Sequence, residues 1–276
     1  MKYVILCLIA LAVCIALGAV VTALIGRSLK KRDRRLARPA AVLMTVVFAL
    51  AIACAAMFGY LEIYCHADGE AAAALESGDG VNVSHEGRVW AFDGPGARAA
   101  LVFYPGAKVE AEAYAPLLRE LAENGVDCFL AEMPFRMAIF GSGAAGDIIA
   151  AHDYEDWYVG GHSMGGMTAA GYAAGHPDEV AGVIMLAAYS TEKLDDGLEL
   201  FSVYGTEDGC LERAVYEENR SNWPQNSHVA ESVIPGANHA QFGSYGAQSG
   251  DGEPGITAEE QRHMTADQIA RFILAG

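Results

Sequence analysis

The clearest indication of the fold of this chain is the segment Trp157-Tyr158-Val159-Gly160-Gly161-His162-Ser163-Met164-Gly165-Gly166. Its first residues are apolar or small, as in a buried strand, and a helix-like run of small residues extends from Met164 to His176. The five residues from Gly161 to Gly165 form the G-x-S-x-G pattern of a sharp turn between a strand and a helix. Small residues flank the serine because the two backbones pass close together in this strained turn. The pattern predicts that Ser163 is a nucleophile at the N-terminus of a helix.

Short apolar runs alternate with helical stretches around this turn, a pattern that is typical of a parallel sheet wrapped by helices. The predicted strands are Val81–Ser84, Val89–Asp93, Ala99–Tyr104, Val126–Met133, Trp157–His162, Val180–Ala187, Leu198–Tyr204 and Val229–Ile234. The predicted helices are Glu110–Asn124, Met164–His176 and Ala258–Leu274, the last with Thr257 as its N-cap. The sequence therefore predicts an α/β fold.

Two loops supply partners for the serine. Gly205-Thr206-Glu207-Asp208-Gly209 follows one predicted strand, and Pro235-Gly236-Ala237-Asn238-His239 follows the next. The carboxyl ends of parallel strands form the site in such sheets, and the chain order Ser, Asp or Glu, His is that of a G-x-S-x-G hydrolase. We predict that His239 is the general base and Asp208 the acid that orients it. Asp208 is preferred to Glu207 because Asp before Gly suits a tight loop of short reach.

An oxyanion needs two backbone donors, and the sequence offers candidates for both. One is the N–H of Met164, and the other is the N–H of Ala107, in the loop after the predicted strand Ala99–Tyr104. Lys108 is the neighbouring alternative; its side chain is interpreted either as a substrate-binding group or as a solvated lysine.

The apolar stretch from Met133 to Phe140 has two interpretations. Phe135 and Phe140 either form the wall of an acyl pocket and bind substrate, or belong to a packed surface helix. Only about ten residues separate the predicted strand that ends near Ala188 from the one that starts near Leu198. Since no large lid fits there, we predict an open site.

The N-terminal part contains two uncharged runs of 23 and 22 residues, Tyr3–Ile25 and Ala40–Leu61. Each spans roughly 30 Å as a helix, the thickness of a bilayer core. Residues 26–39 contain seven Lys and Arg residues, and such short basic loops stay cytoplasmic. We predict a transmembrane hairpin in residues 1–64, with helices at about 3–25 and 40–62, a linker at 65–80 and a domain at 81–276 on the extracytoplasmic side. A signal peptide, which has a shorter apolar core, and a buried core helix are the alternatives.

The charge of the chain is asymmetric. After Tyr64 there are 33 Asp and Glu against 10 Lys and Arg, so the net charge is 10 − 33 = −23. A domain with this charge repels nucleic acid, which excludes a nucleic-acid-binding function. Its three cysteines, Cys65, Cys128 and Cys210, form neither a disulfide framework nor a zinc motif. The sequence leaves open whether Cys65 and Cys210 form a disulfide.

The combined motifs resemble a known family. From about Val89 onward, the chain is similar to the single-domain, dienelactone-hydrolase-like branch of the α/β-hydrolase superfamily. The resemblance rests on Tyr104-Pro105-Gly106, residues 161–166, residues 204–209 and residues 238–246. It implies an α/β-hydrolase fold with a mostly parallel sheet of about eight strands, and a mechanism without metal or cofactor that passes through an acyl-enzyme on Ser163. Dienelactone hydrolases proper use a cysteine nucleophile, so Ser163 argues against that activity. Relatives often have Gly at the position of Ala107, and the larger side chain of Ala107 would narrow the site.

The sequence thus predicts a membrane-anchored serine hydrolase that acts on a small-molecule or lipid-like carboxylic ester. Amides and thioesters are less favoured substrates. One alternative is a catalytically idle binding module at the membrane with the same fold. Another is an acyltransferase, in which the same three residues act but water is kept from the acyl-enzyme. Neither the acyl length nor the oligomeric state is indicated by the residues.

Overall fold

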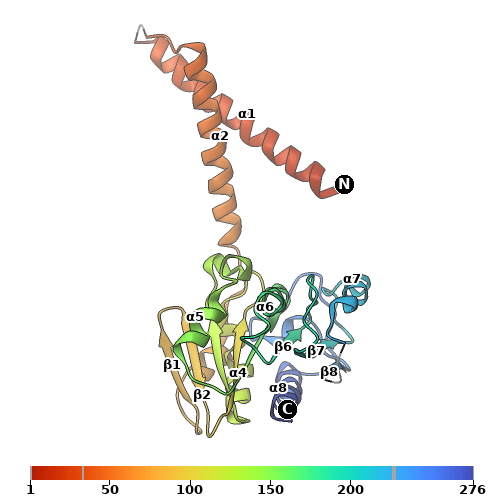
Figure 1. Cartoon of the computed structure of the whole chain (residues 1–276). Coiled ribbons are helices and arrows are strands. Elements are labelled where there is room, and N and C mark those ends of the chain that lie inside the picture. The colour runs from red at the N-terminus through yellow and green to blue at the C-terminus, as the bar shows by residue number, and fades with distance from the viewer. Residues whose placement is uncertain (1, 33, 226–227, 276) are drawn as a thin grey trace. The chain divides into compact units, whose positions relative to one another are not determined.

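The computed structural model describes residues 2–32, 34–225 and 228–275 of the chain. The chain divides into two compact units, Met1–Ile63 and Tyr64–Gly276. The first unit contains helices α1 (Lys2–Lys30) and α2 (Arg38–Leu61), and all the strands lie in the second (Figure 1). The second unit is called the α/β domain below.

Helices α1 and α2 pack closely in the first unit. A Cβ atom on Gly18 would lie 2.7 Å from the carbonyl oxygen of Thr45, so glycine is needed where the two backbones meet. The Thr45 hydroxyl donates to the Thr22 hydroxyl at 3.1 Å, across the same contact. The segments Leu8–Lys30 and Arg38–Leu61 are long and apolar enough to cross a bilayer. Helix α1 continues to Lys30, beyond the predicted end near residue 25, so the connecting loop is shorter than predicted.

The α/β domain is built on one eight-stranded sheet with the order β1-β2-β4-β3-β5-β6-β7-β8. Strands β1 and β2 are antiparallel to their neighbours, and all the other pairs are parallel. The strands are β1 (Asn82–Glu86), β2 (Val89–Asp93), β3 (Ala99–Tyr104), β4 (Val126–Ala131), β5 (Asp156–His162), β6 (Gly182–Leu186), β7 (Glu199–Gly205) and β8 (Val229–Ile234). The α/β prediction and its eight strands are confirmed, with β4 ending at Ala131 rather than Met133.

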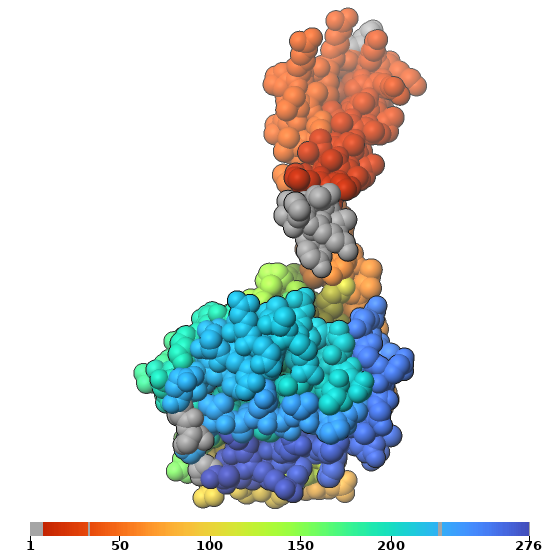
Figure 2. All heavy atoms as spheres, turned by 90° about the vertical axis from the view of Figure 1, so that its right-hand side faces the viewer, coloured from red at the N-terminus to blue at the C-terminus, as the bar shows by residue number. Residues whose placement is uncertain are grey.

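Helices cover both faces of the sheet (Figure 1). They are α3 (Gly69–Ala74), α4 (Ala115–Glu123), α5 (Ala144–Ala151), α6 (Met164–Gly175), α7 (Arg213–Asn219) and α8 (Ala258–Leu274). Alternate residues of β3 point to opposite faces: Leu101 and Phe103 pack with α4 and α8, whereas Val102 and Tyr104 pack with α5 and α6. Residues from about 190 onward gather on one face of the domain (Figure 2).

The described residues of the domain also form five short 3₁₀ helices: η1 (Ala111–Tyr114), η2 (Pro134–Arg136), η3 (Ala138–Phe140), η4 (Arg220–Asn222) and η5 (Ala240–Phe242). The predicted helix Glu110–Asn124 is therefore only partly α-helical, since η1 forms its first turn. Pro116 explains this, because proline lacks an N–H and is tolerated only in the first turn of an α-helix. The predicted N-cap of α8 is confirmed, because the Thr257 side chain accepts a hydrogen bond from the N–H of Glu260.

Candidate active site

Ser163 lies in a strained turn between β5 and α6. Its φ of 54° and ψ of −123° lie in a backbone region that residues other than glycine rarely adopt. The turn needs its glycines: a Cβ atom would lie 2.4 Å from the Tyr104 carbonyl oxygen if placed on Gly161, and 2.0 Å if placed on Gly165. The serine is half-buried. Because it precedes the first residue of α6, it lies beside backbone N–H groups that have no partner within the helix.

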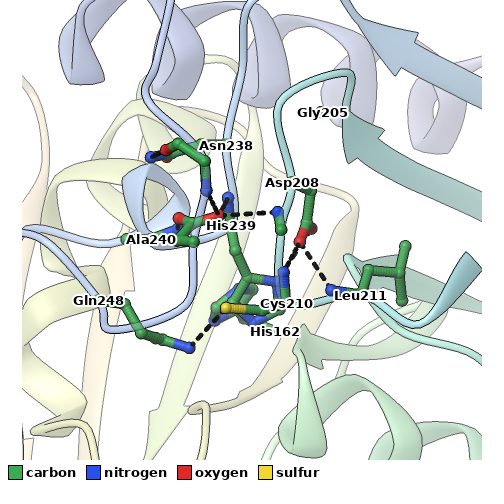
Figure 3. A network of polar contacts seen from close by, with 12 residues as sticks. His162, Gly205, Asp208, Cys210, Leu211, Asn238, His239, Ala240 and Gln248 are labelled. Carbon is green, nitrogen blue, oxygen red and sulfur yellow. Dashed lines mark hydrogen bonds and ion pairs between the residues drawn. The ribbon is translucent and has the colours of Figure 1, made fainter.

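His239 and Asp208 are hydrogen-bonded in the structure. The distance from His239 Nδ1 to Asp208 Oδ2 is 2.9 Å, and the two residues are only 3% and 9% exposed (Figure 3). Asp208 lies in the loop after β7, and His239 follows β8 by a few residues. Glu207, the alternative acid, is exposed and accepts a hydrogen bond from the Thr206 hydroxyl instead.

The other oxygen of the Asp208 carboxylate is also bound. Oδ1 accepts hydrogen bonds from the N–H groups of Cys210 at 2.9 Å and Leu211 at 2.8 Å (Figure 3). Burial acts to raise the pKa of Asp208, but the hydrogen bond and charge of His239, together with these two N–H groups, outweigh it and lower the pKa. The carboxylate is therefore ionised at neutral pH and held in one orientation.

His162, the residue before the serine, links the serine turn to His239. The two imidazole centroids are 4.4 Å apart. Burial, and then the charge of His239, lower the pKa of His162 well below its usual value, so this ring is neutral. A neutral ring leaves His239 free to take up a proton without a cation beside it. His162 Nε2 is buried and has no hydrogen-bond partner within the described residues.

The loop after β3 is held by Tyr114, which the sequence did not identify. The fully buried Tyr114 hydroxyl accepts a hydrogen bond from the N–H of Gly106 at 3.1 Å and lies 2.8 Å from His162 Nδ1. Two residues later, the N–H of Lys108 donates to the carbonyl of Arg136 at 2.8 Å. The N–H groups of Gly106 and Lys108 thus donate to other groups, and the N–H of Ala107 between them takes part in neither of these two hydrogen bonds. The sequence does contain a signal for this role: Tyr114 lies within the apolar pattern of residues 110–124, and a buried tyrosine hydroxyl needs a hydrogen-bond partner.

Asp251 is a second residue that sequence reasoning missed. Its Oδ1 accepts hydrogen bonds from the N–H of Gly209 at 3.0 Å and from the N–H of His239 at 3.1 Å, and Oδ2 accepts from the N–H of Ala240 at 2.8 Å. The Asp251 carboxylate thus connects the loop that contains Asp208 to the loop that contains His239. Nothing in the glycine-rich stretch around Asp251 separates it from an ordinary turn residue.

A pocket of about 470 Å³ adjoins the residue after the serine. Among its lining residues are Ile139, Met164 and Met167. Phe135 and Phe140, predicted to wall an acyl pocket or to lie in a packed helix, do not line this pocket, but Phe140 lines a separate pocket of about 790 Å³. They are 44% and 57% exposed, with their rings in a T-shaped contact at 6.0 Å. Residues 134–140 form η2 and η3 rather than an α-helix, because Phe135 and its neighbour adopt φ values of 55° and 57°.

The cysteines of the domain do not form disulfides: Cys65, Cys128 and Cys210 are all free. Cys210 lies beside the acid loop, where its sulfur accepts a hydrogen bond from the Gln248 side chain at 3.3 Å (Figure 3). Burial, followed by the charge of Asp251, raises the pKa of the Cys210 thiol. This thiol is therefore not an activated nucleophile.

Comparison with known proteins places the fold. Residues 100–263 match the model of the alpha/beta hydrolase family. The chain is similar to a CIB-like hydrolase from Thermoplasma acidophilum (17% identity, 70% of this chain and 100% of that chain, TM-score 0.52). It is also similar to dienelactone hydrolase from Anabaena variabilis (14% identity, 71% of this chain and 98% of that chain, TM-score 0.52). A third similar structure is a soluble variant of monoglyceride lipase from Saccharomyces cerevisiae (10% identity, 70% of this chain and 94% of that chain, TM-score 0.50). No curated protein matches the chain. Because the family model covers more than half of its residues, this chain belongs to the alpha/beta hydrolase family.

Proposed function

We propose that this protein is a membrane-anchored serine hydrolase that cleaves carboxylic esters through an acyl-enzyme on Ser163. The observation that carries the proposal is the buried hydrogen bond of 2.9 Å between His239 and Asp208. A hydrogen-bonded imidazole and carboxylate, on the two loops that follow the last strands, are the base and orienting acid that a serine nucleophile needs. The strained turn at Ser163 supplies the third part.

In the first half-reaction, His239 takes the proton of the Ser163 hydroxyl while Oγ forms a bond to the ester carbonyl carbon. Asp208 holds the proton on Nδ1, so that Nε2 is the basic nitrogen, and its charge stabilises the imidazolium that forms. The tetrahedral intermediate then breaks its bond to the alcohol oxygen, which takes the proton from His239. In the second half-reaction, a water molecule gives a proton to the same nitrogen and forms a bond to the acyl carbon. The bond from that carbon to Oγ then breaks, the acid leaves, and Oγ takes the proton back from His239.

The oxyanion is stabilised by the N–H groups of Met164 and Ala107. Met164 is the first residue of α6, so its N–H has no acceptor within the helix. On the second loop, Gly106 and Lys108 already donate to other groups, which favours Ala107 between them. Fixed backbone donors of this kind lower the barrier because they need no reorganisation when charge develops.

An ester in a membrane setting is the substrate class that fits best. Fold alone does not fix the substrate. A structural neighbour of the chain is nevertheless a monoglyceride lipase, whose substrate is a carboxylic ester. Helices α1 and α2 are long and apolar enough to anchor the chain in a bilayer, and the basic residues between about 27 and 38 favour a cytoplasmic position for their connection. The α/β domain then lies on the extracytoplasmic side.

The activated serine is tested with a fluorophosphonate probe, which forms a covalent bond with nucleophilic serines. The full chain in detergent is expected to be labelled at one residue, and the Ser163→Ala variant is expected to lose the label completely. Ser221→Ala, at an exposed serine in η4, is the matched control and retains it. A folded wild-type chain that takes no label, or a Ser163→Ala chain that is still labelled, contradicts the proposal.

Tyr114→Phe is expected to lower kcat by about tenfold with little change in KM, because the loop that carries Ala107 loses its hydroxyl support. The buried N–H of Gly106 also loses its acceptor, which costs about 1–3 kcal/mol of stability. The measurement is steady-state kinetics together with thermal unfolding. Tyr158→Phe is the matched control: it removes the hydrogen bond to Glu199, at 2.7 Å, without touching this loop. If both variants lower kcat equally, or Tyr114→Phe leaves it unchanged, Tyr114 does not position the oxyanion donor.

A further inference from the structure

The chain enters the α/β domain beside the proposed oxyanion loop. Cys65 forms an isolated parallel bridge with Val109. The N–H of Cys65 donates to the carbonyl of Lys108 at 2.7 Å, and the N–H of Glu110 donates back to the carbonyl of Cys65 at 2.9 Å. Any segment that precedes Tyr64 therefore leaves the domain from this edge.

The same edge also holds the aromatic turns η2 and η3. The N–H of Lys108 donates to the carbonyl of Arg136, and the guanidinium of Arg136 lies over the ring of Tyr64, 3.4 Å from its centroid. This is close enough for a cation–π interaction. Residues 133–140, called the aromatic loop below, are thus joined by backbone and side-chain contacts to the point where the chain enters the domain.

Three large apolar side chains of the aromatic loop face solvent. Phe135, Ile139 and Phe140 are 44%, 54% and 57% exposed. Among the described residues from Tyr64 onward, only two other large apolar side chains are exposed, Val233 and Leu274, and they lie on β8 and α8. Single exposed apolar residues are ordinary, but a cluster of them marks an interaction surface.

A bilayer is the partner that the chain itself brings to this surface. Helix α2 is long and apolar enough to span a bilayer and ends at Leu61. Only residues 62–64 separate Leu61 from Cys65. The Cα atoms of Leu61 and Cys65 can therefore be at most about 14 Å apart. Aromatic side chains with a neighbouring cation are the residues that gather where headgroups meet acyl chains. Arg136 supplies the cation, in a domain with few of them.

We propose that the aromatic loop inserts Phe135, Ile139 and Phe140 into the surface of the bilayer, and that the site takes its ester from that bilayer. This inference rests on the proposed function and narrows its substrate class to membrane-borne acyl esters. Ile139 connects the two parts of the argument, because it belongs to the aromatic loop and also lines the pocket beside Met164. On this proposal, Ile139 is where an acyl chain would pass from the bilayer to that pocket.

Insertion is tested separately from catalysis by fluorescence. The full chain is reconstituted in phosphatidylcholine vesicles, with and without bromine on the acyl chains, as wild type, Phe140→Trp and Leu274→Trp. The signal that Trp adds at position 140 is expected to be lost in brominated vesicles, and the signal added at position 274 is expected to persist. If bromine leaves the added signal at 140 unchanged, the loop does not enter the bilayer. If position 140 is instead shielded by a second copy of the chain in a dimer, the surface is a dimer interface and the inference is overturned.

The substrate class is tested by comparing two esters in the same vesicles, a monoacylglycerol in the bilayer and a short water-soluble ester. Phe135→Ser combined with Phe140→Ser is expected to lower hydrolysis of the monoacylglycerol about tenfold more than hydrolysis of the soluble ester. Leu274→Ser, at a residue that is also 44% exposed, changes neither rate. Equal losses with both esters, or no loss with either, overturn the inference. A wild-type chain that hydrolyses neither ester and takes no fluorophosphonate label counts instead against the proposed function, while the fluorescence result still decides insertion.

Discussion

Replacing His239 with Ala is expected to lower kcat for a water-soluble ester by about 10⁴- to 10⁶-fold, as much as Ser163→Ala does, and the double variant should lose no more. The losses do not add because the serine and the histidine act as one unit: without the base, the hydroxyl keeps its proton. What remains is the rate that the oxyanion donors and substrate binding support alone. The measurement is single-turnover kinetics on the full chain, normalised to folded protein.

The matched control for His239→Ala is His263→Ala, at an exposed residue of α8 that pairs with Glu120. It is expected to retain wild-type kcat. A His239→Ala variant that keeps more than about a tenth of the wild-type rate would identify a different base, because general-base catalysis contributes at least a hundredfold. If the double variant lost far more than either single one, the two residues would act in separate steps.

The regular geometry of a parallel sheet explains why the sequence could predict that Asp208 and His239 lie together. Each alternation of an apolar run with a helix places the next loop at the same edge. Two loops far apart in the sequence can thus be assigned to one site without any knowledge of their contacts. Asp208 and His239 are the result, and the structure brings their side chains to hydrogen-bonding distance. The strained conformation at Ser163 follows from its own pattern of flanking glycines.

Residues whose role depends on contacts across the fold were not predictable in this way. Asp251 binds the N–H groups of Gly209 and His239, and nothing local to it specifies those partners. The aromatic loop shows the limit for local structure as well. Phe135 and Arg136 adopt positive φ without being glycine, so an apolar segment that suggests a helix forms two 3₁₀ turns instead. Tertiary contacts, such as the one between Lys108 and Arg136, override the local preference there.

Asp208→Asn is expected to lower kcat by about 10⁴-fold while the fold is retained. The structure fixes how the amide must lie. Oδ1 accepts from the N–H groups of Cys210 and Leu211, so the amide carbonyl takes that place and the NH₂ group faces His239 Nδ1. Nδ1 must then accept a hydrogen bond, which puts the ring proton on Nε2, where it blocks uptake of the serine proton. Glu207→Gln, at the exposed neighbour, is the control and should keep the wild-type kcat. The reverse outcome would make Glu207 the acid.

The same variant separates the role of Asp208 in catalysis from its role in stability. The pKa of Asp208 is lowered in the folded chain, so its carboxylate stabilises the fold above the usual pKa of 3.8, and this contribution is lost as the pH falls through the lower folded value. Thermal unfolding should therefore show a difference between wild type and Asp208→Asn that is constant at neutral pH and shrinks below about pH 4. The loss of kcat, by contrast, should be present at neutral pH, where both chains are folded. A difference in unfolding that does not change on acidification would mean that the carboxylate is not held ionised by His239 and the two N–H groups.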